Sequence, residues 1–494
     1  MQSNIFHPSY KEFSELAKHS NIIPVYTEIL SDIETPVSVL LKLNHLPYPF
    51  LLESVEGGEK WARYSFIGFK PSSVFRVRHG DVFITEHGRT KIQRNVPDPL
   101  ELLKTELKKY RPAVIKDLPR FVGGAVGYFG YDIVKTFEKV PDLKKQPLNF
   151  DDVFLLFTDK LVIFDNLRHT MIVLSSAFIK DDNIKHAYST AVSSVKKVIS
   201  ILSKPVATVK KERKYAIKPF RSNMTPGEYE QMVMKGKKHI IDGDIIQVVL
   251  SQRFFSPSKV NLLSFYRALR LINPSPYMFY FNLGDRYLVG SSPEVLVRFE
   301  NGKVTIRPIA GTRKRGKTME EDAALERELL ADEKERAEHV MLVDLARNDI
   351  GRIAKTGSVK VDELMIVERY SHVMHIVSEV SGTALDGRDA VDILKSVFPA
   401  GTLSGAPKVK AMEIIEHLEK DSRGPYGGAV GYISYTGSMD TCITIRTAFV
   451  DQKGLSIQSG AGIVYDSIPE KEYLETRSKA QALMDALKKS AEIR

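Results

Sequence analysis

Two stretches of the chain carry pairs of glutamates three residues apart, a spacing that places both carboxylates on one face of a helix. Glu335 and Glu338 form the first pair, and Glu472 and Glu475 form the second. Two such helices that converge could hold one divalent cation, and an all-oxygen donor set that retains water suits Mg²⁺. Solvated, salt-bridged helix faces are the alternative interpretation of both pairs.

The segment around Glu338 separates these interpretations. Glu338 precedes Met341 and Leu345 at helical spacing, so the sequence predicts its carboxylate in the middle of an apolar helix face. A carboxylate buried there must meet a cation, become protonated or bind a metal ion. We therefore predict Glu338 and Glu475 as direct ligands of Mg²⁺, with a buried ion pair as the alternative for Glu338.

A second group of features suits the carboxylate of a small anionic ligand. The segment ITIRTAF places Arg446 in an otherwise apolar, strand-like run, where a guanidinium needs an anion. Gly460-Ala461-Gly462 presents backbone amides without bulky side chains, and Lys479 follows Glu475 by four residues. Together these groups predict a small polyanionic ligand whose charge is partly neutralised by the metal ion.

Two other motifs have competing interpretations. Residues 311–318, GTRKRGKT, match the spacing of a phosphate-binding loop, but their bulky side chains would obstruct a backbone cradle. VMLVD at 340–344 also continues a helical pattern, so we reject a nucleoside triphosphatase. His375 lies in the strand-like run YSHVMHIVSEVSG, on the opposite face from His372, which is poor geometry for zinc. His375 faces a pocket in one interpretation and the core in the other.

The elements that position these groups belong to a long globular chain. Its 494 residues suggest two or three domains. Its one cysteine, Cys442, argues against an internal disulfide and a cysteine-based zinc site. We find neither a signal peptide nor a membrane-spanning run, so we expect a cytoplasmic location without membrane contact. The net charge of +10 would fit nucleic acid, but the basic residues are dispersed among acidic ones, so nucleic-acid binding is the disfavoured alternative.

Local signals divide the chain into two portions. Residues 206–222 are charged and punctuated by proline, so we expect a linker between residues 1–205 and residues 223–494. Capping boxes at Thr225 and Ser467 predict the starts of two helices.

An internal echo indicates that sheets occur in both portions. The run GGAVGYFGYD at 123–132 resembles GGAVGYISYT at 427–436. Their glycines suggest close approach of backbones within strands. Such strands could pair with each other or occupy equivalent places in similar halves.

Together these segments resemble the chorismate-utilising enzymes, and most closely the anthranilate synthase component I group of that family. The matching motifs run in order along nearly the whole chain: LLES (51–54), ARYSFIG (62–68), NPSPYMFYF (273–281), SSPE (291–294), PIAGTR (308–313), ERAEHVMLVDLARND (335–349), RYSHVMH (369–375), GTLSGAPK (401–408), YGGAVGY (426–432) and GAGIVYDSIPEKEYLETRSKA (460–480). The resemblance implies an α+β fold, with large antiparallel sheets packed as a sandwich and helices outside. It also implies a lyase that converts chorismate and ammonia into anthranilate and pyruvate.

The resemblance implies roles for individual residues. Mg²⁺ would be bound by Glu338 and Glu475, with Glu335 and Glu472 supporting it through water. Glu294 would be the general acid that protonates the departing hydroxyl, and His375 would assist the loss of pyruvate. The remaining matches would hold the substrate, at its enolpyruvyl carboxylate through Tyr426, Arg446, Gly460, Ala461, Gly462 and Lys479, and along its ring through Gly311, Thr312 and Thr402.

Two positions favour amination over related chemistries. Family members that use water carry a lysine where this chain has Gln247, and a glutamine is no base at neutral pH. Aminodeoxychorismate synthases often carry a lysine that attacks the ring where this chain has Ala310. The resemblance therefore implies ammonia as nucleophile and anthranilate as product, with an aminodeoxychorismate synthase component I as the alternative.

The resemblance further implies regulation and a partner. The residues that match the family's allosteric tryptophan site are Ser54, Asn273, Pro276, Tyr277 and Met278. We therefore expect feedback inhibition by L-tryptophan and a regulatory, amino-acid-binding role for residues 1–205, with residues 223–494 as the catalytic portion; simple packing motifs are the alternative. Ammonia would come from glutamine through a separate amidotransferase subunit, since Cys442 lacks the glycine-rich turn of such a nucleophile.

Overall fold

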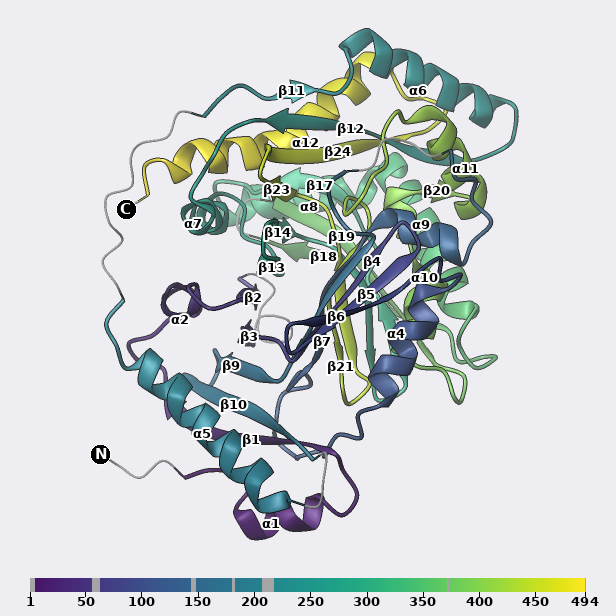
Figure 1. The fold of residues 1–494 in the computed structure, drawn as a ribbon. Helices are drawn as coiled ribbons and strands as arrows, with labels where there is room; N and C mark the ends of the chain where they lie inside the picture. Colours follow the sequence, from purple (N-terminus) through teal and green to yellow (C-terminus); the bar gives the residue numbers. More distant parts are fainter. Residues whose placement is uncertain are drawn as a thin grey trace.

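Two large antiparallel sheets form the centre of the molecule (Figure 1). The computed structural model describes residues 5–55, 63–143, 148–179, 183–206, 217–370 and 373–493. The predicted class, α+β with antiparallel sheets packed as a sandwich and helices outside, is confirmed. The first sheet runs in the order β1 (Ile22–Leu30), β10 (Thr170–Phe178), β9 (Lys160–Asp165), β3 (Tyr64–Gly68), β2 (Phe50–Glu53), β13 (Tyr277–Asn282), β14 (Tyr287–Ser292), β23 (Thr447–Asp451), β24 (Gly454–Ile463), β12 (Gln247–Ser256) and β11 (Arg221–Ser222), with β20 (Gly405–Ala406) beside β12.

The second sheet is built from the same two portions of the chain. Its order is β17 (Ile309–Lys314), β19 (Val373–Thr383), β16 (Lys303–Ile306), β15 (Val295–Glu300), β22 (Met439–Ile443), β21 (Ala429–Ser434), β7 (Gly124–Phe129), β8 (Val153–Thr158), β4 (Ser73–Arg78), β5 (Asp81–Glu86) and β6 (Arg89–Gln93), with β18 (Lys360–Arg369) beside β19. Because β2 pairs with β13 and β7 pairs with β21, residues 1–205 and 223–494 share both sheets. Most of the expected linker, residues 207–216, lies outside the described residues.

The echoed glycine runs are neighbouring strands, as one of the two interpretations expected. In the pairing of β7 with β21, Gly127 lies opposite Gly431. Both glycines have φ near +155°, at 154° and 157°. A side chain on either one would come within 2.0–2.1 Å of a backbone carbonyl oxygen of the next strand. Only glycine allows the strands to approach so closely, which explains the repeated motif.

Eleven α-helices lie around the two sheets in the described part of the chain (Figure 1). They are α1 (Tyr10–Leu16), α2 (Pro36–Leu43), α4 (Pro99–Lys108), α5 (Ile184–Leu202), α6 (Pro226–Ile241), α7 (Leu262–Ile272), α8 (Met319–Ala331), α9 (Glu333–Gly351), α10 (Ala390–Val397), α11 (Lys408–Leu418) and α12 (Pro469–Ser490). The main core includes residues of both sheets, such as Phe281 and Tyr128, because the sheets pack face to face. A second core lies between the first sheet and helices such as α7 and α12.

The two predicted capping boxes have different outcomes. Thr225 caps α6, where its side chain accepts from the Glu228 amide and the Glu228 carboxylate reaches back. The prediction for Ser467 is wrong, because α12 begins at Pro469 with Ile468 as its N-cap residue. The Ser467 hydroxyl accepts a hydrogen bond from the Val464 amide at 3.1 Å and is therefore used in the turn before the helix.

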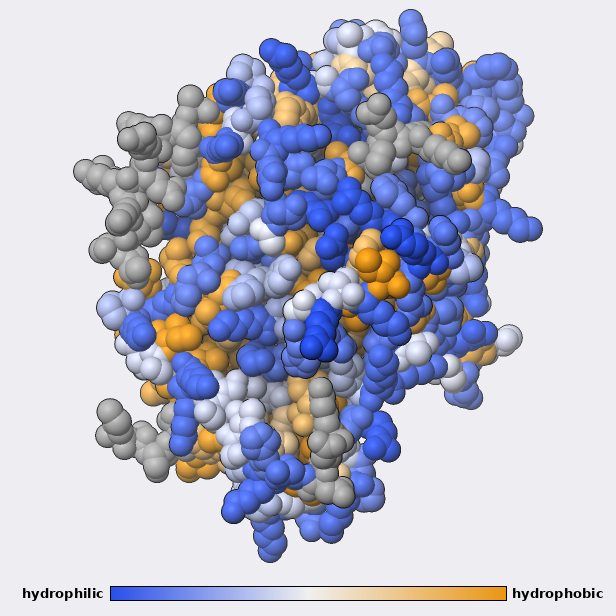
Figure 2. Space-filling model, viewed as in Figure 1, coloured by the Kyte–Doolittle hydropathy of each residue, from blue (hydrophilic) through white to orange (hydrophobic). Residues whose placement is uncertain are grey.

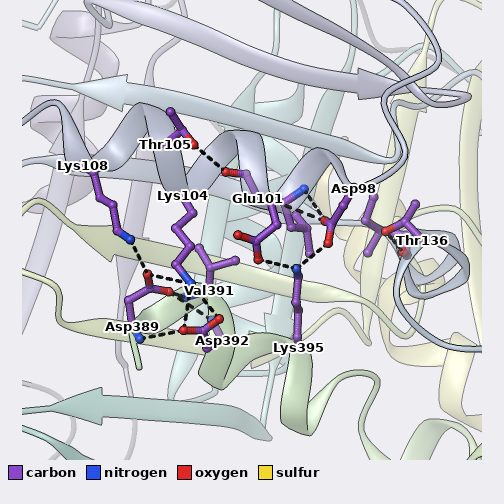
Figure 3. A network of polar contacts seen from close by, with 12 residues as sticks. Asp98, Glu101, Lys104, Thr105, Lys108, Thr136, Asp389, Val391, Asp392 and Lys395 are labelled. Carbon is purple, nitrogen blue, oxygen red and sulfur yellow. Dashed lines mark hydrogen bonds and ion pairs between the residues drawn. The ribbon is translucent and has the colours of Figure 1, made fainter. Parts of the chain in front are cut away.

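An ion-pair network joins the two portions of the chain at α4 and α10 (Figure 3). Lys104 of α4 lies 2.9 Å from Asp392, and Lys395 of α10 lies 2.7 Å from Asp98 and 2.8 Å from Glu101. Because α10 also packs on α9, the network braces the helix that carries the first glutamate pair.

Hydrophilic residues predominate on the face of the molecule shown in Figure 2. Among the described residues, none of the helices combines the length and apolar character needed to cross a lipid bilayer.

Candidate active site

The four predicted glutamates lie on two helices whose charges influence one another. Glu335 and Glu338 lie on α9, and Glu472 and Glu475 lie on α12. Desolvation by the surrounding protein raises the pKa of Glu338, and the negative charges of Glu335 and Glu475 raise it further. Burial also raises the pKa of Glu472, to which the Glu475 charge contributes. Lys479 opposes both shifts.

The predicted burial of Glu338 in an apolar face is wrong. Although the protein partly encloses its carboxylate, solvent reaches Glu338, while the next residue, His339, is fully buried. The buried stripe of α9 is formed by His339, Leu342, Val343, Ala346, Asp349 and Ile350. The stripe is therefore rotated by one residue from the predicted one, and it leaves the Glu338 carboxylate accessible to a ligand.

The donor chemistry of the glutamates fits Mg²⁺. In the described part of the chain, no three His, Cys, Asp or Glu side chains already form a metal-binding group. The fit rests instead on carboxylates that lie close enough to raise the pKa of Glu338 and of Glu472, since a divalent cation would relieve that repulsion.

Glu294 lies in the link between β14 of the first sheet and β15 of the second, directly before β15 begins at Val295. Burial raises the pKa of its carboxyl group, while the positive charge of Arg446, a hydrogen bond from Thr402 and the charge of Lys479 lower it. The Thr402 hydroxyl donates to the Glu294 carboxylate at 3.1 Å. A carboxyl group with a raised pKa can hold a proton at higher pH than usual, as a general acid requires.

The prediction that Arg446 lies within a strand is wrong. The residue lies between β22 and β23. Its backbone has φ 48°, in the left-handed region, so the chain turns sharply at this residue. Burial lowers the pKa of the guanidinium, and the Glu294 charge opposes that shift. Arg446 lines a cavity of about 170 Å³.

His375 of β19 lines the same cavity, together with Thr312 and Tyr370. Its Nδ1 lies 3.1 Å from the Gly311 carbonyl oxygen and 3.0 Å from the Thr312 hydroxyl. Since a carbonyl only accepts, Nδ1 carries the proton and Nε2 is the basic nitrogen of the neutral ring. Burial lowers the pKa of His375, which keeps the ring neutral. His372 lies outside the described residues.

Apart from Arg446, the predicted carboxylate-binding groups lie along the free edge of β24. Pairing with β23 ends at Ile457, so residues 458–463 have β12 as their one strand partner among the described residues. A side chain at Gly460 would come within 2.9 Å of the Tyr426 hydroxyl. Lys479 donates to the Gly460 carbonyl at 3.2 Å and pairs with Glu475 at 2.7 Å, so it connects this edge to the glutamates.

Gln247 lies at the start of β12, close to Gly462 and almost fully buried at 5% exposure. A side chain at Gly462 would come within 2.7 Å of its Nε2. The buried side-chain oxygen has no hydrogen-bond partner among the described residues. An amide oxygen in this state is suited to accept a hydrogen bond from a small ligand.

Most of the residues predicted to bind L-tryptophan lie around a separate cavity of about 420 Å³. Four of them, Ser54, Pro276, Tyr277 and Met278, line it, whereas Asn273 lines the cavity of His375. Pro276 lines both cavities.

Sequence reasoning missed several lining residues. Arg120, Arg298 and Asp440 line the larger cavity, and both arginines pair with Asp440, at 3.1 and 2.9 Å. Tyr370, beside His375, was also missed, although it falls within the quoted motif RYSHVMH. These residues carried no signal of their own because their contacts are made across distant strands.

Comparison with known proteins finds relatives over nearly the whole chain. The chain matches the family described as chorismate binding enzyme over residues 48–485. It is 51% identical over 484 residues to anthranilate synthase component 1 of Aquifex aeolicus, which covers 97% of each chain, and 48% identical over 500 residues to that of Acetivibrio thermocellus, which covers 99% of this chain and all of the relative.

Solved structures show the same fold. The crystal structure of anthranilate synthase component I from Streptococcus pneumoniae superposes with a TM-score of 0.77 at 36% identity, over 92% of this chain and 98% of that one. The menaquinone-specific isochorismate synthase of Escherichia coli is 18% identical, with a TM-score of 0.70 over 97% of this chain and 99% of that one, and shares the fold. The chain therefore belongs to the family of chorismate binding enzymes, in the group formed by the anthranilate synthase component 1 chains.

Proposed function

We propose that this enzyme is a lyase that converts chorismate and ammonia into anthranilate and pyruvate, the first committed step of tryptophan biosynthesis. The observation that supports this most strongly is the Glu294 carboxyl group, whose pKa is raised by burial and whose charge interacts with the cations of Arg446 and Lys479. A proton donor next to two cations suits a substrate that carries carboxylates and a hydroxyl leaving group.

In the first step Glu294 gives its proton to the C4 hydroxyl, which leaves as water. Ammonia adds at C2, the ring double bonds shift, and the added nitrogen loses one proton. The Gln247 oxygen can accept an N–H of ammonia but cannot remove a proton from water, which favours amination over hydroxylation. Thr402 holds the Glu294 carboxyl group through its hydrogen bond.

In the second step His375 Nε2 removes the proton from C2 of the aminated ring. The electron pair of that C–H bond forms the last ring double bond, and the C3–O bond breaks. The enolpyruvyl group leaves and takes up a proton to become pyruvate, while the ring becomes aromatic. The contacts of Nδ1 with Gly311 and Thr312 support this role because they fix the tautomer.

The substrate's carboxylates would be held at two places. Arg446, Tyr426, Lys479 and the backbone of residues 460–462 would bind the enolpyruvyl carboxylate. Glu338 and Glu475, supported by Glu335 and Glu472, would hold Mg²⁺ near the ring carboxylate. When bound, the ion would orient that carboxylate and stabilise negative charge on it.

The proposal also covers regulation and ammonia supply. Tryptophan would occupy the 420 Å³ cavity and favour an arrangement that binds chorismate less well. The shared wall at Pro276 supports such coupling between the two cavities. The component 1 relatives imply a second component, which we propose is a glutamine amidotransferase that delivers ammonia.

The test is incubation of the purified chain with chorismate, Mg²⁺ and an ammonium salt, followed by anthranilate fluorescence and chromatography of all products. We expect anthranilate and pyruvate in equal amounts, and inhibition by tryptophan. Chorismate consumption that gives a para-aminated product would support the aminodeoxychorismate synthase alternative, and an absence of consumption would refute both.

A further inference from the structure

We propose that Tyr370 is a positioning residue for His375, and that Glu368 and Arg307 hold Tyr370 in place. This inference rests on the proposed role of His375 in the second step. It concerns the hydroxyl group of Tyr370, which donates to Glu368.

Tyr370 contacts His375 directly. The two ring centroids are 5.7 Å apart at an interplanar angle of 61°, an edge-to-face arrangement. Tyr370 follows β18, whose Glu368 is the cross-strand partner of His375 on β19. Both rings line the 170 Å³ cavity. Tyr370 is thus the neighbour that limits how the imidazole can turn.

The Tyr370 hydroxyl is held by a carboxylate that is itself fixed. It donates to one oxygen of Glu368 at 2.8 Å, while Arg307 donates to the other oxygen at 2.7 Å. Arg307 is 7% exposed and also lies 3.6 Å from Glu379. A buried guanidinium that also pairs with Glu363 at 3.9 Å holds the Glu368 carboxylate in one orientation.

The backbone of Tyr370 is fixed from the opposite side. Its amide donates to the Val373 carbonyl at 2.8 Å, and its carbonyl accepts from Arg315 at 2.6 Å. Arg315 is in turn bound to Asp322 of α8. With both its backbone and its hydroxyl held, the ring of Tyr370 has one orientation against the imidazole.

This arrangement gives a step-specific expectation. The contacts with Gly311 and Thr312 hold one nitrogen of His375, but they leave the tilt of the ring free. The edge of Tyr370 limits that tilt, so Nε2 stays aimed at the cavity. Loss of the hydroxyl should therefore slow proton removal in the second step and leave the first step, which uses Glu294, nearly unchanged.

The experiment compares Tyr370→Phe and Glu368→Gln with the parent enzyme. Chorismate consumption, anthranilate and the aminated compound that retains its enolpyruvyl group are quantified together by chromatography. We expect anthranilate formation to fall on the order of 10-fold, with the KM for chorismate changed less than about twofold. The aminated compound should be released in both variants, as it should be in His375→Gln.

A matched control is Tyr266→Phe. The Tyr266 hydroxyl donates to Glu53, which pairs with Arg270 at 2.6 Å. The substitution therefore disrupts the same combination of tyrosine, glutamate and arginine, but at a place that does not include His375. This variant should keep the parent ratio of aminated compound to anthranilate. Unfolding midpoints measured for all variants identify any general loss of structure.

Two results would overturn the inference: a parent-like product ratio in Tyr370→Phe, or equal loss of both steps with an unchanged unfolding midpoint. If the parent enzyme makes no anthranilate, the proposed function itself fails. If the parent makes anthranilate and His375→Gln releases the aminated compound but Tyr370→Phe does not, only the positioning role fails.

Discussion

Removal of the Arg423 guanidinium should reveal how strongly one buried ion pair stabilises the active-site loops. Arg423 is 2% exposed and Glu419 is 5% exposed. Two nitrogens of Arg423 donate to Glu419, at 2.6 and 2.9 Å. The same guanidinium donates to the carbonyls of Leu403 and Val249, at 2.6 and 2.7 Å. It therefore joins the residue after Thr402 to strand β12.

The magnitude follows from what Arg423→Met leaves behind. Glu419 would keep its hydrogen bonds from the Ser251 amide and hydroxyl, both 2.8 Å, but would lose the cation that contacts it directly. Breaking such a pair costs about 3–5 kcal/mol. In the double variant Arg423→Met with Glu419→Gln, neither charge of this pair remains. The loss in free energy of unfolding should therefore be smaller than the sum of the losses in the two single variants, by about 0.5–3 kcal/mol.

Urea unfolding of the parent, both single variants and the double variant measures this coupling through the midpoints and slopes. Arg286→Met is a useful comparison, since its partner Asp151 would keep Arg76 at 2.9 Å. We expect it to lose less stability than Arg423→Met. Additive losses in the double variant, or a loss below about 1 kcal/mol for Arg423→Met, would refute the reasoning.

The other predictions concern the chemistry. Glu294→Gln should lower chorismate consumption about 10²- to 10⁴-fold with an unchanged unfolding midpoint, because it removes the proton donor. Burial raises the pKa of Glu294 and Thr402 lowers it, and the acid is active when protonated, so activity should fall as pH rises through that pKa. Thr402→Val should raise the pKa and move the alkaline limb of kcat/KM to higher pH; a move to lower pH would contradict the assignment. Activity should disappear in EDTA and return with Mg²⁺, and Glu338→Gln should fold but remain inactive; full activity of that variant would exclude Glu338 as a ligand.

The parts of the fold that follow local rules could be predicted from the sequence. The capping box at Thr225 forms because its partners lie three residues apart. The repeated glycine runs indicated strands, and these strands pair with each other. Glycine is needed there because φ is near 155° and an added Cβ atom would lie about 2 Å from a carbonyl oxygen. The helical reading of residues 340–344 is also confirmed, because they lie within α9.

The parts that depend on distant contacts could not be predicted. Helical spacing alone placed Glu338 in the apolar face, but the buried face of α9 is set by what packs against it, and His339 faces Ser378 of β19 instead. Arg446 was assigned to a strand because its neighbours are apolar, yet its left-handed backbone turns the chain there. The pair Glu419–Arg423 has ordinary i,i+4 spacing, and nothing in that spacing shows that it is buried.

The electrostatics of the site explain why the acidic helices and the cationic edge of β24 occur together. Burial raises the pKa values of Glu338 and Glu472, and neighbouring glutamate charges raise them further, so the glutamates alone repel an anionic substrate. Lys479 lies at the boundary, paired with Glu475 and bonded to the Gly460 carbonyl. A divalent cation bound by Glu475 would compete with Lys479 for that carboxylate. The ammonium group would then be available to a substrate carboxylate beside Gly460. Binding of the metal ion would therefore make the site more positive for an anionic substrate in two places, at the glutamates and beside Gly460.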